Sequence, residues 1–390
     1  MKADLYAARV DANGSGAAGR QDWDVVVVGG GPAGLSAAHA AATGGARTLV
    51  LEKAVHPRYK TCGGGLIGFT VRAVTGRIEI PADDHIVRAD FTHDGRRAFS
   101  RSARRGPLLQ MVRRPQFDDA LRLAAEKAGA VVRQSATVRA LEQSADAVTV
   151  RLADGSAVTG ATVIGADGSS GITARHAGVE YGQVDLGLEV ELPVPAGVAA
   201  RWKGRVLIDW GPLPGSYAWV FPKDDVLTVG VIAARGQGER TKRYLRDFVT
   251  RLGLDGIEPV HDSGHLTRCR TPASPLRTGR VLVAGDAAGL LEPWTREGIS
   301  FAVRSGALAG AAAATGDLDG YVTAVERTLV PAMTAGRRLL DTFSRRPGLF
   351  HAMLRTPPGW RMFERFCLGE TSFERTVERL PVRTALRLLR

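Results

Sequence analysis

The segment from residue 24 to residue 52 constrains the fold most, because it predicts a strand, a glycine turn, a helix and a second strand in close succession. Four consecutive valines are typical of a short strand buried on both faces of a parallel sheet. An alanine-rich helix follows and ends near Gly44–Gly45, before a second strand at 48–51. The turn has the spacing G-x-G-x-x-G, formed by Gly29, Gly31 and Gly34. This order predicts a β-α-β unit that binds a dinucleotide.

Each part of this unit has a physical role in holding a pyrophosphate. The first glycine permits the tight turn, the second lets the backbone approach the phosphates, and the third lets helix and strand pack closely. The helix begins at Pro32, and its N-terminus favours negative charge. Glu52 ends the second strand, where a carboxylate can accept hydrogen bonds from ribose hydroxyls, and Lys53 follows it. We expect all of these residues to contact the cofactor.

The composition predicts a globular protein of a reducing compartment. The chain has 390 residues, 44% hydrophobic and 24% charged, which allows more than one domain with a buried core. Its three cysteines form neither a zinc pattern nor a disulfide framework. No signal sequence and no membrane-spanning apolar run is found, which predicts a cytoplasmic protein. Residues 1–22 predict a disordered tail.

The positive charge is concentrated near the C-terminus. The formal net charge is +12, and residues 331–390 hold twelve arginines against five acidic residues. This pattern favours a solvated helical face. The alternative is attraction to an anionic substrate or to a membrane surface, hence peripheral membrane association. Nucleic acid is not an expected partner, because the basic residues are not interleaved with aromatic residues and no binding motif is present.

Two later strands narrow the choice of dinucleotide cofactor. Residues 161–168 (ATVIGADG) end at Asp167, and residues 280–289 (RVLVAGDAAG) contain Gly285 and Asp286. Alone, each aspartate–glycine pair would predict only a turn. With the GGGPAG turn they resemble the large flavoprotein superfamily that includes the aromatic hydroxylases, which implies FAD. In that superfamily the second aspartate meets the ribityl chain, and the following helix points its positive end at the flavin.

Two further segments fit the same resemblance. In residues 112–121 (VRRPQFDDAL), Arg114 matches an arginine that lies near the FAD pyrophosphate and ribose. The alternative is a solvent-facing arginine at a helix start. Residues 134–142 (QSATVRALE) resemble the strand whose backbone touches the adenine, which places Thr137 near FAD.

The fold class expected is α/β. A Rossmann-like FAD-binding domain would be combined with an antiparallel β-sheet substrate domain and a helical C-terminal region. Residues 86–99 predict a hairpin turning at Asp94–Gly95, and residues 240–253 predict a helix. Helices are also expected from about residue 320 onward, with breaks at Pro347 and Pro357–Pro358. The predicted parts are a discontinuous FAD-binding domain (23–80, 103–178 and 272–330), a substrate domain (81–102 and 179–271) and a basic helical region (331–390).

Three motifs resemble the geranylgeranyl reductase family. They are PRYKTCGGGL (57–66), YAWVFPK (217–223) and GDAAGLLEPWTREGI (285–299). The likeness covers about residues 23–330 and implies an enzyme that uses reduced FAD to saturate carbon–carbon double bonds of a prenyl chain. It implies that Cys62, Gly63 and Gly65 lie along the flavin ring. For the Cys62 side chain, packing against the ring, shaping or protonation near the alkene, and a peroxide-sensitive thiol all remain open.

The aromatic motif has two interpretations. Tyr217 and Trp219 can stabilise carbocation-like charge on an alkene through their electron-rich faces, and they also offer apolar area to a prenyl chain. Alternatively, two aromatic residues two positions apart on a strand simply share one face of the core. Lys223 would end this strand, and it can be a plain surface charge.

The third motif departs from the family. Geranylgeranyl reductases commonly place two or three glycines before the isoleucine of the flavin-ring motif, whereas this chain reads TREGI. The resemblance therefore assigns only Gly298 and Ile299 to the flavin. Our hypothesis is that Arg296 lies near the flavin or the substrate, and the alternative is a surface salt bridge with Glu297 or Glu292.

Other functions share the FAD motifs. An FAD-dependent monooxygenase of an apolar or aromatic substrate is the main alternative, followed by a flavin halogenase and a non-enzymatic flavin-binding module. The electron donor is expected to be NADPH or reduced ferredoxin, the latter as a protein partner, because no second glycine fingerprint marks an NADPH domain. The prenyl-chain substrate and its number of double bonds stay open.

Overall fold

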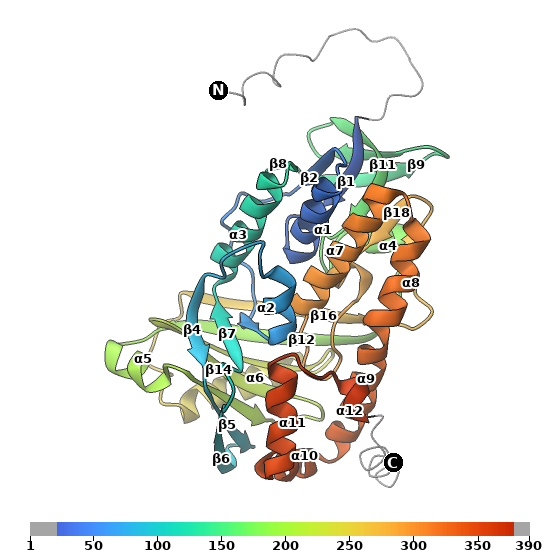
Figure 1. Cartoon of the computed structure of the whole chain (residues 1–390). Helices are drawn as coiled ribbons and strands as arrows, with labels where there is room; N and C mark the ends of the chain where they lie inside the picture. Colours follow the sequence, from blue (N-terminus) through green and yellow to red (C-terminus); the bar gives the residue numbers. More distant parts are fainter. Residues whose placement is uncertain (1–21, 378–390) are drawn as a thin grey trace.

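The computed structural model describes residues 22–377. Residues 1–21 of the predicted N-terminal tail, and residues 378–390 of the predicted basic C-terminal region, lie outside the described residues. Within the described range the chain forms two large sheets and one small sheet, with helices between and around them (Figure 1).

The eight-stranded sheet contains the predicted nucleotide-binding unit. Its strands are β1 (Trp23–Val28), β2 (Thr48–Leu51), β8 (Val131–Arg133), β9 (Val138–Gln143), β10 (Val148–Leu152), β11 (Ala157–Gly165), β17 (Arg277–Thr278) and β18 (Val281–Val283). The order β18-β11-β1-β2-β8 is parallel throughout. Strands β9 and β10 pair antiparallel with each other, and β10 also pairs with β11. The parallel core with crossover helices is the Rossmann-like domain predicted from the sequence.

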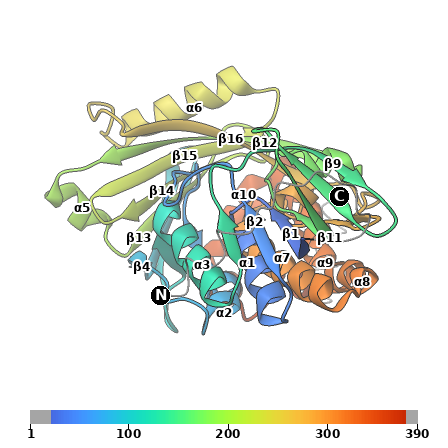
Figure 2. The same cartoon turned by 90° about the horizontal axis from the view of Figure 1, so that it is seen from above.

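The valine run of β1 is buried on both faces. Val25 and Val27 pack toward the helices α1 (Pro32–Thr43) and α7 (Ile299–Thr315). Val26 and Val28 pack toward the layer formed by β9 and β10. Side chains alternate between the faces of a strand, so a continuous apolar run requires cover on both sides. The helix α3 (Arg114–Lys127) lies beside α1 (Figures 1 and 2).

The second large sheet has seven strands. Its order is β16-β12-β15-β14-β13-β5-β6. The strands are β5 (Arg88–His93), β6 (Arg96–Ser102), β12 (Tyr181–Pro193), β13 (Arg205–Trp210), β14 (Tyr217–Lys223), β15 (Val226–Ala234) and β16 (His261–Arg270). The hairpin predicted at Asp94–Gly95 joins β5 to β6. The sheet is antiparallel except at one pair, because β13 runs parallel to β5.

One face of this sheet is covered by the helix α6 (Gly238–Arg251), as Figure 2 shows. Tyr244 and Phe248 of α6 pack on Ala218 and Val220 of β14. The residues between them on β14 have the opposite orientation and face the interior of the molecule. The short helices α4 (Thr173–Ala177) and α5 (Ala196–Trp202) complete the loops that flank β12.

A small three-stranded sheet joins the two layers. It has the order β3-β7-β4, formed by β3 (Gly65–Leu66), β7 (Leu109–Val112) and β4 (Ala82–Ile86). The helix α2 (Gly68–Val74) follows β3 directly. Strand β3 therefore carries the end of the CGGGL motif into the space between the two large sheets.

Helices form the C-terminal region, as predicted. They are α8 (Leu318–Thr328), α9 (Val330–Arg345), α10 (Pro347–Arg355), α11 (Pro357–Cys367) and α12 (Phe373–Val377). The predicted breaks are confirmed, because Pro347 begins α10 and Pro357 begins α11. Figure 1 shows α10 and α11 beside β5 and β6. Together these elements confirm the α/β fold class, while the predicted domain boundaries stay predictions. Within residues 22–377, no helix is both long and apolar enough to cross a membrane.

Candidate active site

A cavity of about 910 Å³ lies between the eight-stranded sheet, the seven-stranded sheet and the C-terminal helices. This volume is at the upper end of the range for ligand sites. The predicted residues that line it are Gly29, Gly31, Pro32, Glu52, Lys53, Cys62, Gly63, Gly65, Arg114, Thr137, Asp167, Tyr217, Trp219, Asp286, Gly298 and Ile299. Segments far apart in the sequence thus meet around one space.

Two predicted glycines support the wall without lining it. A Cβ on Gly34 would lie 1.9 Å from the carbonyl oxygen of Gly29, so only glycine permits this close approach of helix α1 to the turn. Gly285 has a φ of 56°, and a Cβ there would lie 2.8 Å from the Cβ of Ala33. Both residues therefore set the packing of the nucleotide-binding end.

The N-terminus of α1 is open to the cavity. Gly31 is its N-cap and no side chain caps it, and Pro32 occupies the first turn. A Cβ on Gly31 would have only the Nη2 of Arg58 within 4 Å, at 3.6 Å. The unpaired N–H groups of a helix N-terminus in front of open space form a site for an anion such as a pyrophosphate.

Glu52 is buried beside this turn. Its carboxylate accepts hydrogen bonds from the backbone N–H of Gly30 at 2.6 Å and of Ala54 at 2.9 Å. The Nε of Arg58 lies 3.8 Å from the carboxylate. Lys53 is exposed, so its side chain lies at the rim of the cavity.

Arg114 is buried at the start of α3, so the solvent-facing alternative is wrong. Its guanidinium donates two hydrogen bonds to Asp118, each at 2.8 Å. Burial by itself would lower the pKa of Arg114, but the Asp118 carboxylate and the Cys62 thiol raise it above the usual value. Arg58 also pairs with Asp118, at 3.4 Å. Arg58 thus pairs with both Glu52 and Asp118, and two guanidinium groups stand with two carboxylates beside the open helix end.

The two predicted aspartates follow strands of the nucleotide-binding sheet. Asp167 accepts hydrogen bonds from the backbone N–H and the hydroxyl of Thr173, and burial raises its pKa. Asp286 lies in a 3₁₀ turn (Gly285–Ala288) and pairs with the Nε2 of His265 at 3.7 Å. Burial works to raise the pKa of Asp286, but the neighbouring His265, Lys60 and Arg114 lower it overall. Asp286 therefore favours the ionised form.

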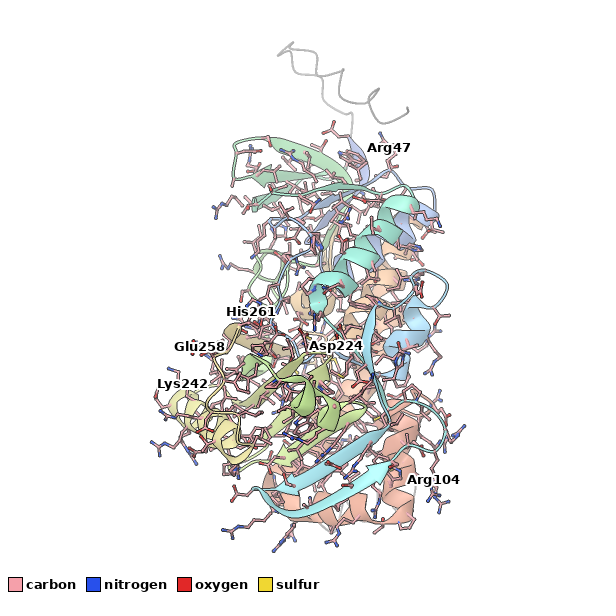
Figure 3. The ribbon with its side chains drawn as sticks, turned by 90° about the vertical axis from the view of Figure 1, so that its left-hand side faces the viewer. Arg47, Arg104, Asp224, Lys242, Glu258 and His261 are labelled. Atoms are coloured by element: carbon pink, nitrogen blue, oxygen red, sulfur yellow. The ribbon has the colours of Figure 1, made fainter. Side chains whose placement is uncertain are left out.

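The CGGGL segment is held by buried acid and base groups. The backbone N–H of Cys62 donates to Glu189 at 2.7 Å, and its carbonyl accepts from the Nζ of Lys223 at 3.3 Å. Lys223 also pairs with Glu191 at 3.2 Å and is only 2% exposed. The surface-charge interpretation of Lys223 is wrong, although β14 ends there. Its neighbour Asp224, labelled in Figure 3, is exposed.

The three glycines have different surroundings. A Cβ on Gly63 would lie 2.9 Å from the ring of Phe221, whereas a Cβ on Gly65 would meet nothing closer than 3.4 Å. Gly64, which was not predicted, has a φ of 77°, and a Cβ there would lie 2.2 Å from the carbonyl oxygen of Val112. The steric need for glycine is therefore greatest at the middle position.

The aromatic motif forms a ladder on β14. Tyr217, Trp219 and Phe221 share the face opposite α6 and line the cavity. Their ring centroids are 5.9 and 6.2 Å apart in succession. Gly230 on β15 pairs with Trp219, and a Cβ there would lie 2.2 Å from the indole ring. The small residue thus lets the indole lie flat on the sheet.

Apolar side chains extend the cavity beyond this ladder. Alternate residues of two neighbouring strands line it, namely Ala89 and Phe91 of β5 and Val206, Ile208 and Trp210 of β13. The far wall comes from the C-terminal helices through Leu354, Phe363, Phe366, Cys367 and Phe373. We call this part the apolar arm. It offers a long hydrocarbon surface with few hydrogen-bonding groups.

Arg296 also lines the cavity, while its hypothesised place near the flavin or the substrate stays a prediction. The alternative partners Glu292 and Glu297 are wrong, because the guanidinium pairs with Asp185 at 3.2 Å, and both side chains are nearly fully buried. Arg296 has a φ of 56°, the conformation in which glycine is usual. Its charge is compensated, so it is not a free cation facing the cavity.

The arrangement fits FAD. One end of the cavity, which we call the nucleotide end, is formed by the open N-terminus of α1. Arg58 and Arg114 lie beside it, and Asp286 of the 3₁₀ turn lines the same cavity. Gly298 and Ile299 begin α7, whose N-terminus points to the same space. When bound, FAD would supply two-electron chemistry.

Several residues of the wall were not predicted from the sequence. They are Arg58, Lys60, Gly64, Glu189, Phe221, His265 and Glu297. Five of them lie inside the quoted motifs, so the motifs could have indicated them as site residues: Arg58, Lys60, Gly64, Phe221 and Glu297. Glu189 and His265 lie on strands with no motif, and only the pairing of β12 with β16 brings them here.

Comparison with known proteins places the chain in a family. The FAD binding domain family matches residues 22–314. Digeranylgeranylglycerophospholipid reductase of Methanocaldococcus jannaschii is 30% identical over 310 residues, 74% of this chain and 76% of that protein. Dialkyldecalin synthase of Streptomyces rugosporus is 31% identical over 294 residues, 69% of this chain and 60% of that protein.

A solved structure has the same fold. It is a geranylgeranyl bacteriochlorophyll reductase-like protein from Thermoplasma acidophilum, with a TM-score of 0.76 at 20% sequence identity, covering 95% of this chain and 100% of that one. The matches over most of the chain, together with the motifs that line one cavity, confirm the resemblance seen in the sequence. The chain belongs to the geranylgeranyl reductase family of FAD-dependent oxidoreductases.

Proposed function

We propose that this enzyme uses reduced FAD to saturate carbon–carbon double bonds of a geranylgeranyl-type prenyl chain. The observation that carries the proposal is the continuity of the cavity, which joins the nucleotide end to the aromatic ladder and the apolar arm. A prenyl chain is long, apolar and unsaturated, so it matches a hydrocarbon surface that begins beside a flavin site. The name of the methanogen relative supports the same class of substrate.

The predicted cofactor residues would each contact a different part of the FAD molecule. The turn of Gly29 and Gly31 with the α1 end would hold the pyrophosphate, Glu52 the ribose, and Asp286 the ribityl chain. Arg114 would stay paired with Asp118 and lie near the pyrophosphate and ribose. Thr137 would lie near the adenine, and Gly298 and Ile299 near the flavin ring.

Tyr217 and Trp219 would act on the substrate. An isolated alkene has no carbonyl to polarise, so charge that develops on carbon needs an electron-rich neighbour. The indole and phenol faces supply one at roughly 1–2 kcal/mol each when water is excluded. Cys62 lies at the cavity wall near Gly63, and its role as a packing group, a chemical group or a sensitive thiol is a separate question.

The electron donor and the location are part of the proposal. NADPH or a reduced ferredoxin would reduce the flavin, either by transient binding or as a protein partner. We propose a cytoplasmic enzyme that works at a membrane surface when its prenyl substrate is a lipid. The arginines of the C-terminal region would then face anionic lipid headgroups.

The test is an anaerobic incubation of the FAD-loaded protein with dithionite and a panel of prenyl diphosphates, prenyl lipids and quinones. The expected result is product that gains two hydrogen atoms per reduced double bond, detected by mass spectrometry. The Gly29→Val variant is the control, because a Cβ there would lie 2.4 Å from the carbonyl oxygen of Ala166 and disrupt the turn. This variant should lose FAD and form no product.

Other reaction products would contradict the proposed reductase activity and indicate a different function. Oxygen-dependent hydroxylation would identify a monooxygenase, and halide incorporation a halogenase. Formation of a dialkyldecalin would match the name of the Streptomyces relative. Flavin that is reduced and reoxidised while every prenyl compound stays unchanged would indicate a flavin-binding module.

A further inference from the structure

A carboxyl group with one free oxygen lies in the wall of the cavity. Glu297 stands between Thr295 and Gly298, in the segment where related reductases have glycine. Its Oε1 accepts a hydrogen bond from the backbone N–H of Ser300 at 2.7 Å, which fixes the side chain at the start of α7. No hydrogen bond to its Oε2 occurs within residues 22–377, and that atom is not sealed from the cavity.

No cation pairs directly with this carboxyl group in the described part of the chain. The charged groups that act on it are Glu292 in the preceding loop, Asp286 in the 3₁₀ turn and Arg304 on α7. Burial raises the pKa of Glu297 to about 7, with Glu292 and Asp286 acting in the same direction. The Ser300 N–H and Arg304 oppose this rise. Glu297 therefore holds a proton in a fraction of molecules at neutral pH.

The other acidic residues of the cavity wall are already engaged. Glu52 accepts from two backbone N–H groups, Asp167 is bonded by Thr173, and Asp286 faces His265. Glu189 is the nearest rival, since burial raises its pKa too. Its Oε1 accepts from Cys62, and the charges of Lys223 and Lys60 favour its ionised form.

We propose that Glu297 is the proton donor for alkene reduction, an inference that rests on the proposed function. One alkene carbon receives a hydride, two electrons with a hydrogen, from the reduced flavin. The π electrons form a C–H bond at the other carbon as the O–H bond of Glu297 breaks. The alkene is reduced, the flavin is oxidised, and the Glu297 carboxylate then takes a proton from water. The apolar side chains of the arm carry no acidic proton, so a fixed acid such as Glu297 in the wall of the same cavity is needed.

The Glu297→Gln variant tests this role. It keeps the acceptor for the Ser300 N–H but holds no transferable proton. We expect kcat to fall by about 10²–10⁴-fold, the usual contribution of a positioned acid, with unchanged FAD affinity. Since the protonated form is active, wild-type activity should be lost as pH rises through about 7, and the variant should lack this decline. Glu297→Asp should restore part of the rate.

Two matched variants make the result specific. Glu292→Gln alters a buried acid that bonds Trp294 and Thr295 and does not line the cavity, so the alkaline decline should persist. Glu189→Gln should also keep it. Loss of the decline in Glu189→Gln but not in Glu297→Gln would overturn the proposal, as would wild-type turnover in Glu297→Gln.

A second readout needs neither substrate nor turnover. Infrared difference spectra of the apoprotein, wild type against Glu297→Gln, should show a protonated carboxyl band that disappears as pH rises through about 7. Absence of this band overturns the inference about Glu297. If the band is present while the wild-type enzyme reduces no prenyl compound, the proposed function fails instead, and the proton-donor role fails with it.

Discussion

At the residue scale, the glycines of the CGGGL segment differ in what they must do. Gly63 and Gly65 were predicted to lie along the flavin, and both line the cavity. The backbone conformation that requires glycine belongs to Gly64 between them. Its carbonyl accepts a hydrogen bond from Val112 at 2.9 Å, which ties the segment to β7. The run of three glycines therefore places a turn at Gly64 between two residues of the cavity wall.

We expect Gly64→Ala to lower the free energy of unfolding by about 1–3 kcal/mol, because the alanine would be strained at a positive φ and would crowd the carbonyl of Val112. Chemical denaturation of the apoprotein measures the change. Gly65→Ala is the control, since its Cβ would make ordinary contacts only, and its effect should stay within about 0.5 kcal/mol. Equal effects of the two substitutions would contradict the structure.

Residues inside local motifs could be predicted from the sequence, and residues whose surroundings are distant could not. Glu52 follows its strand directly, so the neighbouring sequence fixes its place. Lys223 is buried because the segment around Cys62 and the acid on β12 cover it. Arg296 meets Asp185 across the molecule. No local pattern marks either burial, because the partners are distant in the sequence: Cys62 and Glu191 are 161 and 32 positions from Lys223, and Asp185 is 111 positions from Arg296.

At the element scale, the packing of α7 on α1 determines where the cofactor-binding helix end lies. Gly306 and Gly310 are four positions apart and so share one face of α7. Cβ atoms there would lie 2.0 and 2.1 Å from the carbonyl oxygens of Ala33 and Ala37. The two helices approach closely because both contacts are made by glycine.

Gly310→Ala should separate these helices and shift the N-terminus of α1. We expect a loss of about 1–3 kcal/mol in stability, typical of overpacking, and weaker FAD binding. Thermal unfolding and FAD fluorescence titration measure both. Ala311→Ser, on the exposed side of the same helix, should change neither. FAD affinity that is retained in Gly310→Ala would show that α1 keeps its position without this contact.

The order of elements was predictable where each follows from its neighbour. The β1–α1–β2 unit, the hairpin at Asp94–Gly95 and the proline breaks of the last helices all arise from local signals. The parallel pairing of β5 with β13 was not predicted. It joins strands that are more than a hundred residues apart, and alternation along a strand indicates its faces but not its neighbour.

At the scale of the whole molecule, the apolar arm ends on the C-terminal helices. Phe363 of α11 lines it and packs edge-on against Phe91 of β5, with ring centroids 5.6 Å apart. The position of this wall would limit the length of a bound prenyl chain. A region without a recognisable motif would therefore contribute to substrate choice.

Phe363→Ala should lengthen the arm. We expect the ratio of kcat/KM for geranylgeranyl over geranyl diphosphate to rise about tenfold, the order of one added hydrophobic contact. Phe248→Ala is the control, because that ring belongs to α6 and packs in the cluster on the other face of the sheet. It should destabilise the protein by about 3–5 kcal/mol and leave the ratio unchanged. A ratio that stays the same in Phe363→Ala would place the chain end elsewhere.

The pairing of β5 with β13 also affects how the protein forms during synthesis. Strand β5 has left the ribosome long before its neighbour β13 exists, and the cavity is completed only by later segments that include Asp286, Ile299 and Phe373. Strand β5 therefore keeps an unpaired, apolar edge until β13 has been synthesised. FAD can bind its complete site only when most of the chain has been translated, so FAD binding is expected at a late stage of folding.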